Sequence, residues 1–302
     1  MSFLNIVLVG PWERVAIDLR DFEKYLQYLR SHLFVRGIIY ASSDPSGIVP
    51  SEYFDVVCST HSQSDLGSLS CQLGVYDTSF TAQSNLSFSP LYENIKAGVR
   101  ASTAPFTLKA RSDLKIKNLG TVWNALLQAN NKLVIDHHVN HSLLMPLYFS
   151  DMLIGAKTDL IQRAFSKDLK IDMVAKKKLN LSPFCYRGGG CWSPTFAYNE
   201  YRIWATVYSS LTGGKVKKQF DVGYFEWKMS VEFLRDKLLL LDRELVHERH
   251  ARYNTRSFLS RWVFKQGVFQ FSRVTITFLV AKGFFLFCVN TLRYLTNQFK
   301  IR

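Results

Sequence analysis

The sequence has few of the glycine-rich loops that proteins use to cradle phosphate. Only 16 of its 302 residues are glycine, no Gly-x4-Gly-Lys-Ser/Thr motif occurs, and no Gly-x-Gly-x-x-Gly motif follows the first apolar run. These absences argue against ATP use through a P-loop and against hydride transfer on a dinucleotide-binding loop. A Gly-x-Ser-x-Gly motif is also missing, which removes the simplest hydrolase interpretation.

Cysteine is scarce as well, and a targeting signal is not evident. The five cysteines are an odd number without metal-ligand spacing, so we expect free thiols and not a disulfide framework. Residues 3–9 are apolar, but no basic segment precedes them and no small-residue cleavage site follows. We therefore expect no secretory signal and a cytoplasmic location.

Acidic residues are absent from the last part of the chain. Residues 249–302 contain ten basic residues and no acid, against a net charge of +14 for the whole chain, and phenylalanines are interleaved with the bases. The apolar stretch at 274–289 is interrupted by Lys282 and Gly283 and is shorter than the ~20 residues of a membrane span. We predict that residues 231–302 are a helical, basic, aromatic-rich region. It would associate peripherally with the inner face of the cell membrane, whereas the simpler alternative is a helical subdomain packed on the body.

The first third of the chain has the pattern of an α/β sheet. Residues 4–9 form a β-branched run that ends at Gly10-Pro11, and residues 20–33 place apolar side chains at helical spacing. Residues 35–47 then supply a second strand with a Pro/Gly turn, and residues 52–60 look like a third strand. A polar excursion occupies 59–90, and a long helix is predicted over 227–252. This order predicts an open sheet that binds its ligand outside the carboxyl ends of the strands.

One strand is predicted to end in charged residues. In "FTLKARSDLKI", alternation places Lys109, Arg111 and Asp113 on one face. A nucleotide diphosphate with Mn²⁺ or Mg²⁺ would satisfy all three, with Asp113 as the metal ligand. A structural ion pair between Arg111 and Asp113 would satisfy two of them, and the spacing leaves both interpretations open.

A resemblance to a known family extends this interpretation. "IKAGVRASTAPFTLKARSDLKI", followed some 35 residues later by "LYFSDMLIGAKTDL", resembles the WavE family of lipopolysaccharide-synthesis proteins over about residues 4–205. That family is regarded as glycosyltransferases. The resemblance implies a glycosyltransferase type A-like (Rossmann-like) mixed α/β sheet flanked by helices. The catalytic domain would span 1–230, with a donor half at about 1–120 and an acceptor half at about 121–230.

The resemblance also implies roles for particular residues. The chain has one acid at the metal motif, and Asn94-Ile95-Lys96 stands where an Arg-Gln pair is expected. Asp151 and Glu200 are candidate catalytic bases, although Asp151 could equally be a structural cap and Glu200 a first-turn acid. The candidate donor-binding residues are Gly10, Pro11, Asn94, Lys109, Arg111 and Asp113, the last of which is also the candidate metal ligand.

The predicted function is transfer of a sugar from a nucleotide-sugar donor to a surface polysaccharide or lipopolysaccharide-type glycan. A departing diphosphate needs stabilised charge, and an inverting reaction needs a base for the acceptor hydroxyl. The expected partners are the nucleotide sugar, a glycan or lipid-linked glycan, a divalent cation and an anionic membrane surface, with no nucleic acid. The alternative is a non-catalytic adaptor that binds membrane or nucleic acid through its basic C-terminal region.

Overall fold

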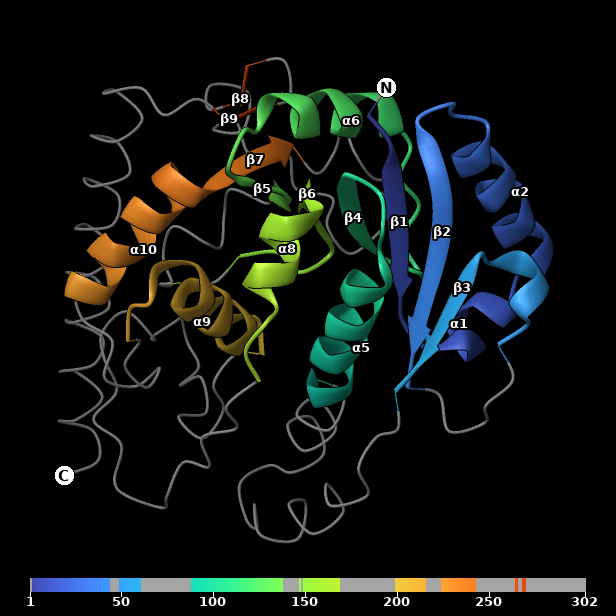
Figure 1. Cartoon of the computed structure of the whole chain (residues 1–302), viewed down its shortest axis with the longest axis horizontal. Coiled ribbons are helices and arrows are strands. Elements are labelled where there is room, and N and C mark those ends of the chain that lie inside the picture. Colours follow the sequence, from blue (N-terminus) through green and yellow to red (C-terminus); the bar gives the residue numbers. More distant parts are fainter. Residues whose placement is uncertain are drawn as a thin grey trace, which may run out of the picture.

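The described part of the chain forms one mixed sheet with helices on both faces (Figure 1). A computed structural model describes residues 2–43, 49–60, 88–137, 147, 149–168, 199–215, 224–242, 264–265 and 268–269. Within these residues nine strands are hydrogen-bonded in the order β3-β2-β1-β4-β6-β5-β7-β9-β8. The predicted class, a mixed α/β sheet flanked by helices, is confirmed.

The strands and helices have the following bounds. The strands are β1 Leu4–Val9, β2 Val35–Ser42, β3 Val56–Ser59, β4 Phe106–Arg111, β5 Leu133–His137, β6 Leu153–Lys157, β7 Leu238–Asp242, β8 Phe264–Lys265 and β9 Val268–Phe269. The helices are α1 Trp12–Ala16, α2 Leu19–Arg30, α5 Phe88–Ala101, α6 Leu119–Gln128, α8 Thr158–Ala164, α9 Asn199–Thr212 and α10 Tyr224–Lys237, with a short 3₁₀ turn at Ser51–Tyr53.

The strand directions bring several strand ends to one edge of the sheet. Strands β3, β2, β1 and β4 are mutually parallel, whereas β6 is antiparallel to β4 and to β5, and β7 is parallel to β5. The carboxyl ends of all these strands except β6 therefore share an edge with the amino end of β6. The chain runs outward from β1 to β2 and β3, then returns to β4 on the other side of β1. This reversal makes the gap between the ends of β1 and β4 a topological switch point.

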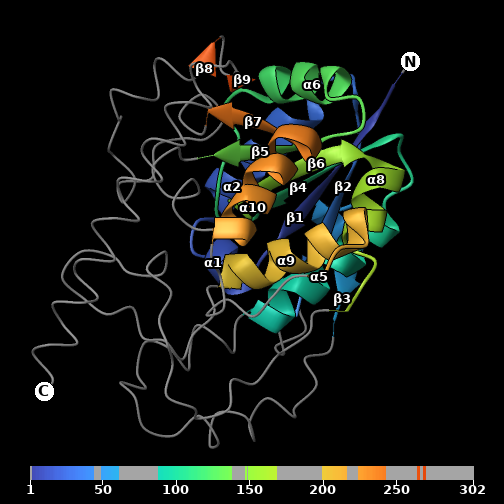
Figure 2. The ribbon, with the colours of Figure 1, turned by 90° about the vertical axis from the view of Figure 1, so that its left-hand side faces the viewer.

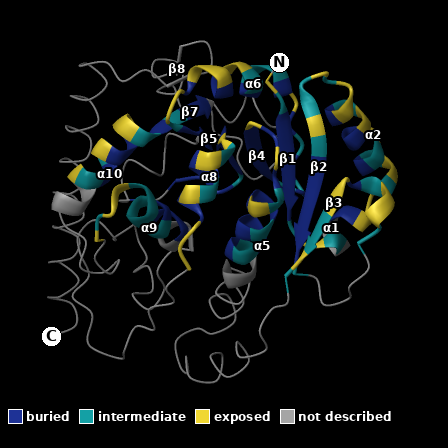
Figure 3. Ribbon diagram, viewed as in Figure 1, coloured by how far each residue is buried: buried dark blue, intermediate teal, exposed yellow. Residues whose placement is uncertain are grey.

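Two apolar layers hold the helices against the sheet. Helices α5, α8, α9 and α10 cover one face, and α1, α2 and α6 cover the other (Figures 1 and 2). Every residue of β1 is buried, as Figure 3 shows, because its apolar run "LNIVLV" is covered on both faces. On α5, Gly98 has no side chain where a Cβ atom would overlap Val7, so the helix packs closely on β1.

The prediction of a single helix over 227–252 is wrong. Helix α10 ends at Lys237, and the leucines that follow form β7, which pairs with β5 inside the sheet. Leu238, Leu240 and Leu241 are buried there, which matches a strand with both faces covered better than an amphipathic helix.

Strands β8 and β9 continue the sheet beside β7, so a few residues of the region predicted to be helical belong to the sheet. Of the predicted region 231–302, the structure describes residues 231–242, 264–265 and 268–269, and most of the 59–90 excursion lies outside the described residues. Among the helices that are described, none combines the length and the apolar character that a membrane span requires. The division into donor half, acceptor half and tail remains a prediction.

Candidate active site at the carboxyl edge of the sheet

Two sequence motifs that are 40 residues apart meet at the carboxyl edge. Strand β4 pairs with β6 so that Ala110 lies opposite Leu153. Beyond that pair, the backbone N–H of Arg111 donates to the carbonyl oxygen of Met152 over 3.0 Å. The end of the "LKARSD" strand is thereby joined to the "FSD" segment that enters β6.

Arg111 and Asp113 form an ion pair with two hydrogen bonds. Arg111 Nε donates to Asp113 Oδ1 over 2.8 Å, and Nη2 donates to Oδ2 over 2.6 Å. The two side chains are 30% and 23% exposed, so the pair lies at the surface of the site. Of the two interpretations that the spacing left open, the ion pair is the arrangement that the structure contains.

The described residues do not fit a divalent cation at Asp113. Both carboxylate oxygens of Asp113 already accept hydrogen bonds from Arg111. In the described ranges no three His, Cys, Asp or Glu side chains are grouped closely enough to hold a metal ion. A cation here would have to displace the guanidinium group of Arg111. No step of the proposed sugar transfer is therefore assigned to the predicted Mn²⁺ or Mg²⁺.

Lys109 lies inside the protein and not on the open side of the strand. The side chain is fully buried, and its Nζ donates to the backbone carbonyl oxygen of Asp151. Burial lowers the pKa of Lys109 to about 8, opposed by the nearby carboxylate of Asp151 and, more weakly, those of Asp136 and Asp113. Because the ammonium group is enclosed, a donor phosphate at the surface of the site would not contact Lys109, contrary to the prediction.

The segment that carries Asp151 is fixed by a buried carboxylate on β5. Asp136 Oδ1 accepts a hydrogen bond from Ser150 Oγ over 2.8 Å and another from the backbone N–H of Leu153 over 3.0 Å. Asp151 itself is 6% exposed, and its carboxylate makes no hydrogen bond to any other residue in the described part. The structure thus brings Lys109, Arg111, Asp113 and Asp151 together around one strand end.

Sequence reasoning missed Asp136 and Ser150. The available signal was an acid placed inside the apolar run "LVIDH", since a buried carboxylate in a strand needs partners. Which partners it finds depends on a pairing between β5 and β6 that no local pattern specifies.

Gly10 and Ser112 meet at the switch point between β1 and β4. The backbone N–H of Ser112 donates to the carbonyl oxygen of Val9 over 3.0 Å. The hydroxyl group of Tyr40 donates to the carbonyl oxygen of Gly10 over 2.9 Å. Ser112 Oγ is buried, and no described residue is its hydrogen-bond partner. A buried hydroxyl group without a partner is costly. The predicted donor residue Pro11 is exposed directly before α1.

A pair of substitutions tests this contact. A Cβ atom on Gly10 would overlap Ser112 Oγ, whereas Ser112 Cβ would lie at an ordinary 3.5 Å. We expect Gly10→Ala to lower the free energy of unfolding by roughly 1–3 kcal/mol, as overpacking does. Adding Ser112→Ala should recover the part of that loss that comes from the overlap, but not the part that comes from the φ of +156° at Gly10, as measured by urea denaturation of the four proteins in a double-mutant cycle. Strictly additive effects would contradict the contact.

Asn94 ties two other strand ends together. Its side chain is buried, its Nδ2 donates to Ser43 Oγ over 3.3 Å, and its Oδ1 accepts from Thr60 Oγ1. Ser43 follows β2 and Thr60 follows β3, so Asn94 lies under the same edge as Gly10.

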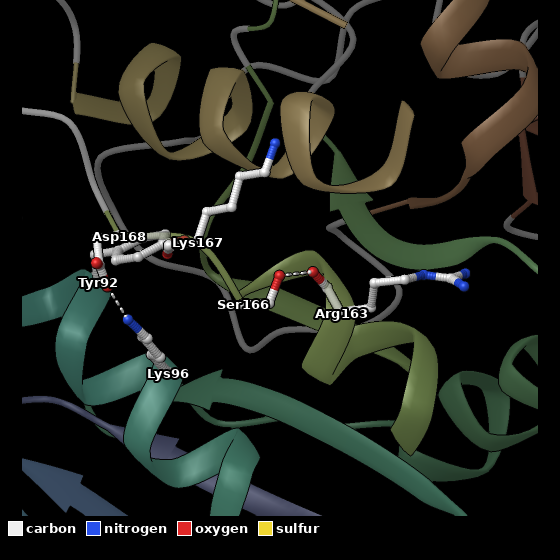
Figure 4. A network of polar contacts seen from close by, with 6 residues as sticks. All are labelled: Tyr92, Lys96, Arg163, Ser166, Lys167 and Asp168. Carbon is white, nitrogen blue, oxygen red and sulfur yellow. Dashed lines mark hydrogen bonds and ion pairs between the residues drawn. The ribbon is translucent and has the colours of Figure 1, made fainter. Parts of the chain in front are cut away.

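A separate polar network fixes the chain where it leaves α8 (Figure 4). Lys96, two residues after Asn94 on α5, is buried and pairs with the exposed Asp168. The hydroxyl group of Tyr92 donates to the carbonyl oxygen of Lys167 over 2.8 Å. Hydrogen bonding to Lys96 lowers the pKa of Asp168, whereas burial raises the pKa of Tyr92. These contacts tie α5 to the residues after α8 and give Lys96 a structural role.

The turn that carries Asp113 is fixed to α2. The backbone N–H of Ile116 donates to the hydroxyl group of Tyr25 and that of Leu119 to Tyr28, each over 3.1 Å. Because both tyrosines belong to one helix, the residues after β4 are held in place before any ligand binds.

Glu200 is the second residue of α9, as expected for an acid that opens a late helix. Its side chain lies outside the described part. Later in the same helix, Trp204 packs edge-on against Phe149, with 5.4 Å between ring centroids. Helix α9 therefore lies beside the segment that carries Asp151.

Comparisons with known proteins give only distant likenesses. No family model matches the chain, and no curated protein matches it. Among solved structures, the chain is similar to the galactosyltransferase LgtC in complex with donor and acceptor sugar analogs, at 11% identity and a TM-score of 0.35, over 53% of this chain and 59% of that one. It is also similar to TarS of S. aureus, at 10% identity and a TM-score of 0.39, over 82% of this chain and 36% of that one. The chain thus spans less than two thirds of each structure that it resembles.

Proposed function

We propose that the protein is a glycosyltransferase that moves a sugar from a nucleotide-sugar donor to a glycan acceptor. The observation that carries the proposal is the gathering of Gly10, Ser112 and the Arg111–Asp113 pair at the switch point between β1 and β4. Open α/β sheets bind their ligands at such points.

The donor diphosphate is assigned to Arg111. A guanidinium group matches the geometry of phosphate oxygens, and Asp113 orients it through two hydrogen bonds. Ser112 follows Arg111 at the same strand end, but its hydroxyl group is buried and is not assigned a phosphate contact. Gly10, Pro11 and Asn94 would line the remainder of the donor position, where the main chain stands close to the ligand.

The transfer step needs a base and a stabilised leaving group. The acceptor hydroxyl oxygen bonds to the anomeric carbon of the donor sugar while the bond from that carbon to the phosphate oxygen breaks. In an inverting reaction, the hydroxyl proton passes to a carboxylate, and we assign this role to Asp151, with Glu200 as the second candidate. Arg111 stabilises the charge that the departing nucleotide gains.

Substitution of Arg111 tests the donor assignment. We expect Arg111→Gln to weaken nucleotide-sugar binding by roughly 10- to 100-fold, because a charge-assisted hydrogen bond contributes about 1.5–3 kcal/mol. The measurement is calorimetric titration with a panel of nucleotides and nucleotide sugars. Arg36→Gln, at an exposed position near the amino end of β2, is the matched control and should bind like the wild type. Equal affinities for all three proteins would contradict the assignment.

The same panel, repeated with Mn²⁺ or Mg²⁺, separates two roles for Asp113. If Asp113 only orients Arg111, Asp113→Ala should weaken binding to a similar extent with and without the cation. If Asp113 exchanges Arg111 for a cation when the donor binds, the loss should appear only when the cation is present.

The class of acceptor glycan is a separate part of the proposal. We assign the acceptor to a surface polysaccharide or lipopolysaccharide-type glycan, in part because a basic aromatic C-terminal region would keep the enzyme near a cytoplasmic membrane face. A suitable truncation follows residue 269, since β8 and β9 pair beside β7 and should be retained. The shortened protein lacks Arg273, Lys282, Arg293, Lys300 and Arg302.

Truncation after residue 269 should reduce binding to vesicles that contain anionic lipid, because each base near such a surface contributes about 1 kcal/mol. Cosedimentation with vesicles of phosphatidylcholine and phosphatidylserine measures this, and pure phosphatidylcholine vesicles are the control. Unchanged cosedimentation would refute the membrane role.

A further inference from the structure

We propose that Lys109 is a positioning residue that holds the Ser150–Met152 segment, so that the carboxylate of Asp151 is presented to the acceptor. This inference rests on the proposed function, and it moves Lys109 from the donor side of the reaction to the acceptor side. It also gives Asp136 and Ser150 a role in holding the same segment.

Each residue of this segment is held by at least one hydrogen bond. Ser150 donates its hydroxyl group to Asp136, Asp151 accepts at its carbonyl oxygen from Lys109, and Met152 accepts at its carbonyl oxygen from the backbone of Arg111. In addition, the backbone N–H of Met152 donates to Ser150 Oγ over 3.2 Å. The Asp151 carboxylate makes no hydrogen bond to another described residue. The segment is thus held through its backbone while its carboxylate stays available to a substrate.

A charged residue suits this position better than a neutral one. The carboxylates of Asp151, Asp136 and Asp113 all lie close enough to act on the ammonium group of Lys109, and the guanidinium group of Arg111 acts in the opposite direction. Three carboxylates around one strand end would repel one another without a buried cation. The ammonium group therefore offsets part of the negative charge that gathers at this strand end.

The position of Lys109 excludes direct contact with solvent. Its side chain is fully buried in a central strand, with β1 on one side and β6 on the other. A ligand at the surface of the site would meet Arg111 and Asp113 before it reached Lys109. Lys109 acts through Asp151, and not on the donor.

Replacement by methionine separates positioning from donor binding. We expect Lys109→Met to lower kcat by about 100-fold, the scale of effect that a displacement of about 1 Å has on a reacting group. The dissociation constant of the donor, measured by calorimetry, should change by less than about threefold. Lys228→Met, which removes an exposed lysine from α10, is the matched control. If donor affinity falls as much as kcat, the proposal is overturned.

A milder variant covers the case in which Lys109→Met does not fold. Ser150→Ala removes the hydrogen bond to Asp136 and keeps the buried lysine. It should lower kcat by about 10-fold, again without a matching change in donor affinity. If Ser150→Ala keeps the wild-type kcat, the proposed positioning of Asp151 is wrong.

A readout without substrate distinguishes this proposal from the proposed function. Amide hydrogen exchange should become faster at Arg111 and Leu153 in Ser150→Ala and in Lys109→Met, with little change at residues of α2. If the wild type transfers no sugar from any donor, the proposed function fails, and faster exchange at these two amides would still support the positioning device. Unchanged exchange there would overturn it.

Discussion

Asp151→Asn should lower the rate of sugar transfer by roughly 10²- to 10⁴-fold, the usual contribution of a general base. Asp151 is buried, and its backbone carbonyl oxygen accepts a hydrogen bond from Lys109. Its carboxylate makes no hydrogen bond to another described residue. An asparagine side chain has nearly the same shape but cannot accept the acceptor proton at neutral pH. The loss should therefore appear in kcat, while the calorimetric dissociation constant of the donor stays within about threefold of the wild type.

The matched control for that experiment is Asp159→Asn. Asp159 is an exposed acid in the first turn of α8, directly after β6 and away from the carboxyl edge. It should transfer sugar at the wild-type rate. If Asp151→Asn also keeps the wild-type rate, Asp151 is not the base, and the same measurement on Glu200→Gln then tests the second candidate.

The stability of the protein should rise with pH above about 8 because of Lys109. Burial lowers the pKa of Lys109 from 10.5 to about 8. Below about pH 8 the amine is protonated in both the folded and the unfolded chain, so it adds no pH dependence. Between about 8 and 10.5 the unfolded chain binds a proton that the folded chain has lost. The free energy of unfolding therefore increases over this window, by roughly 3 kcal/mol at most.

Comparison with Lys109→Met isolates this contribution. Other lysines and the tyrosines titrate in the same window, but they are common to both proteins. Urea denaturation at intervals from pH 7 to 10.5 should show the wild type gaining stability relative to Lys109→Met as the pH rises. Parallel curves for the two proteins would mean that Lys109 has its ordinary pKa and is not enclosed as described.

The sequence predicted those elements whose local pattern admits one structure. The apolar run of β1 is too short for a helix and stops at Gly10-Pro11. The helical spacing of Phe22, Leu26 and Leu29 predicted α2, whose buried residues include all three. The strand predicted over 106–116 is present only over Phe106–Arg111, and Asp113 lies in the turn after it instead of on the strand face. For β1 and α2, local propensity and tertiary packing favour the same structure.

The position of Lys109 could not be predicted from alternation. Alternation correctly places Lys109 and Arg111 on one face of β4, but it does not show that β4 lies between β1 and β6, or that a helix covers that face near Lys109. The same limit explains β7, because leucines next to charged residues fit a helix until the pairing with β5 is known. The partners of Asp136 and the contact of Ser112 with Gly10 depend on long-range pairing in the same way.

The most direct test of the central claim is turnover of nucleotide sugars by the full chain. Purified protein would be incubated with uridine, guanosine and cytidine nucleotide sugars and an extract of surface glycans, and release of free nucleotide would be measured. With one donor class, the wild type is expected to release nucleotide at a rate well above that of Asp151→Asn. If no donor class binds and none is consumed, the carboxyl edge described here is not a sugar-transfer site.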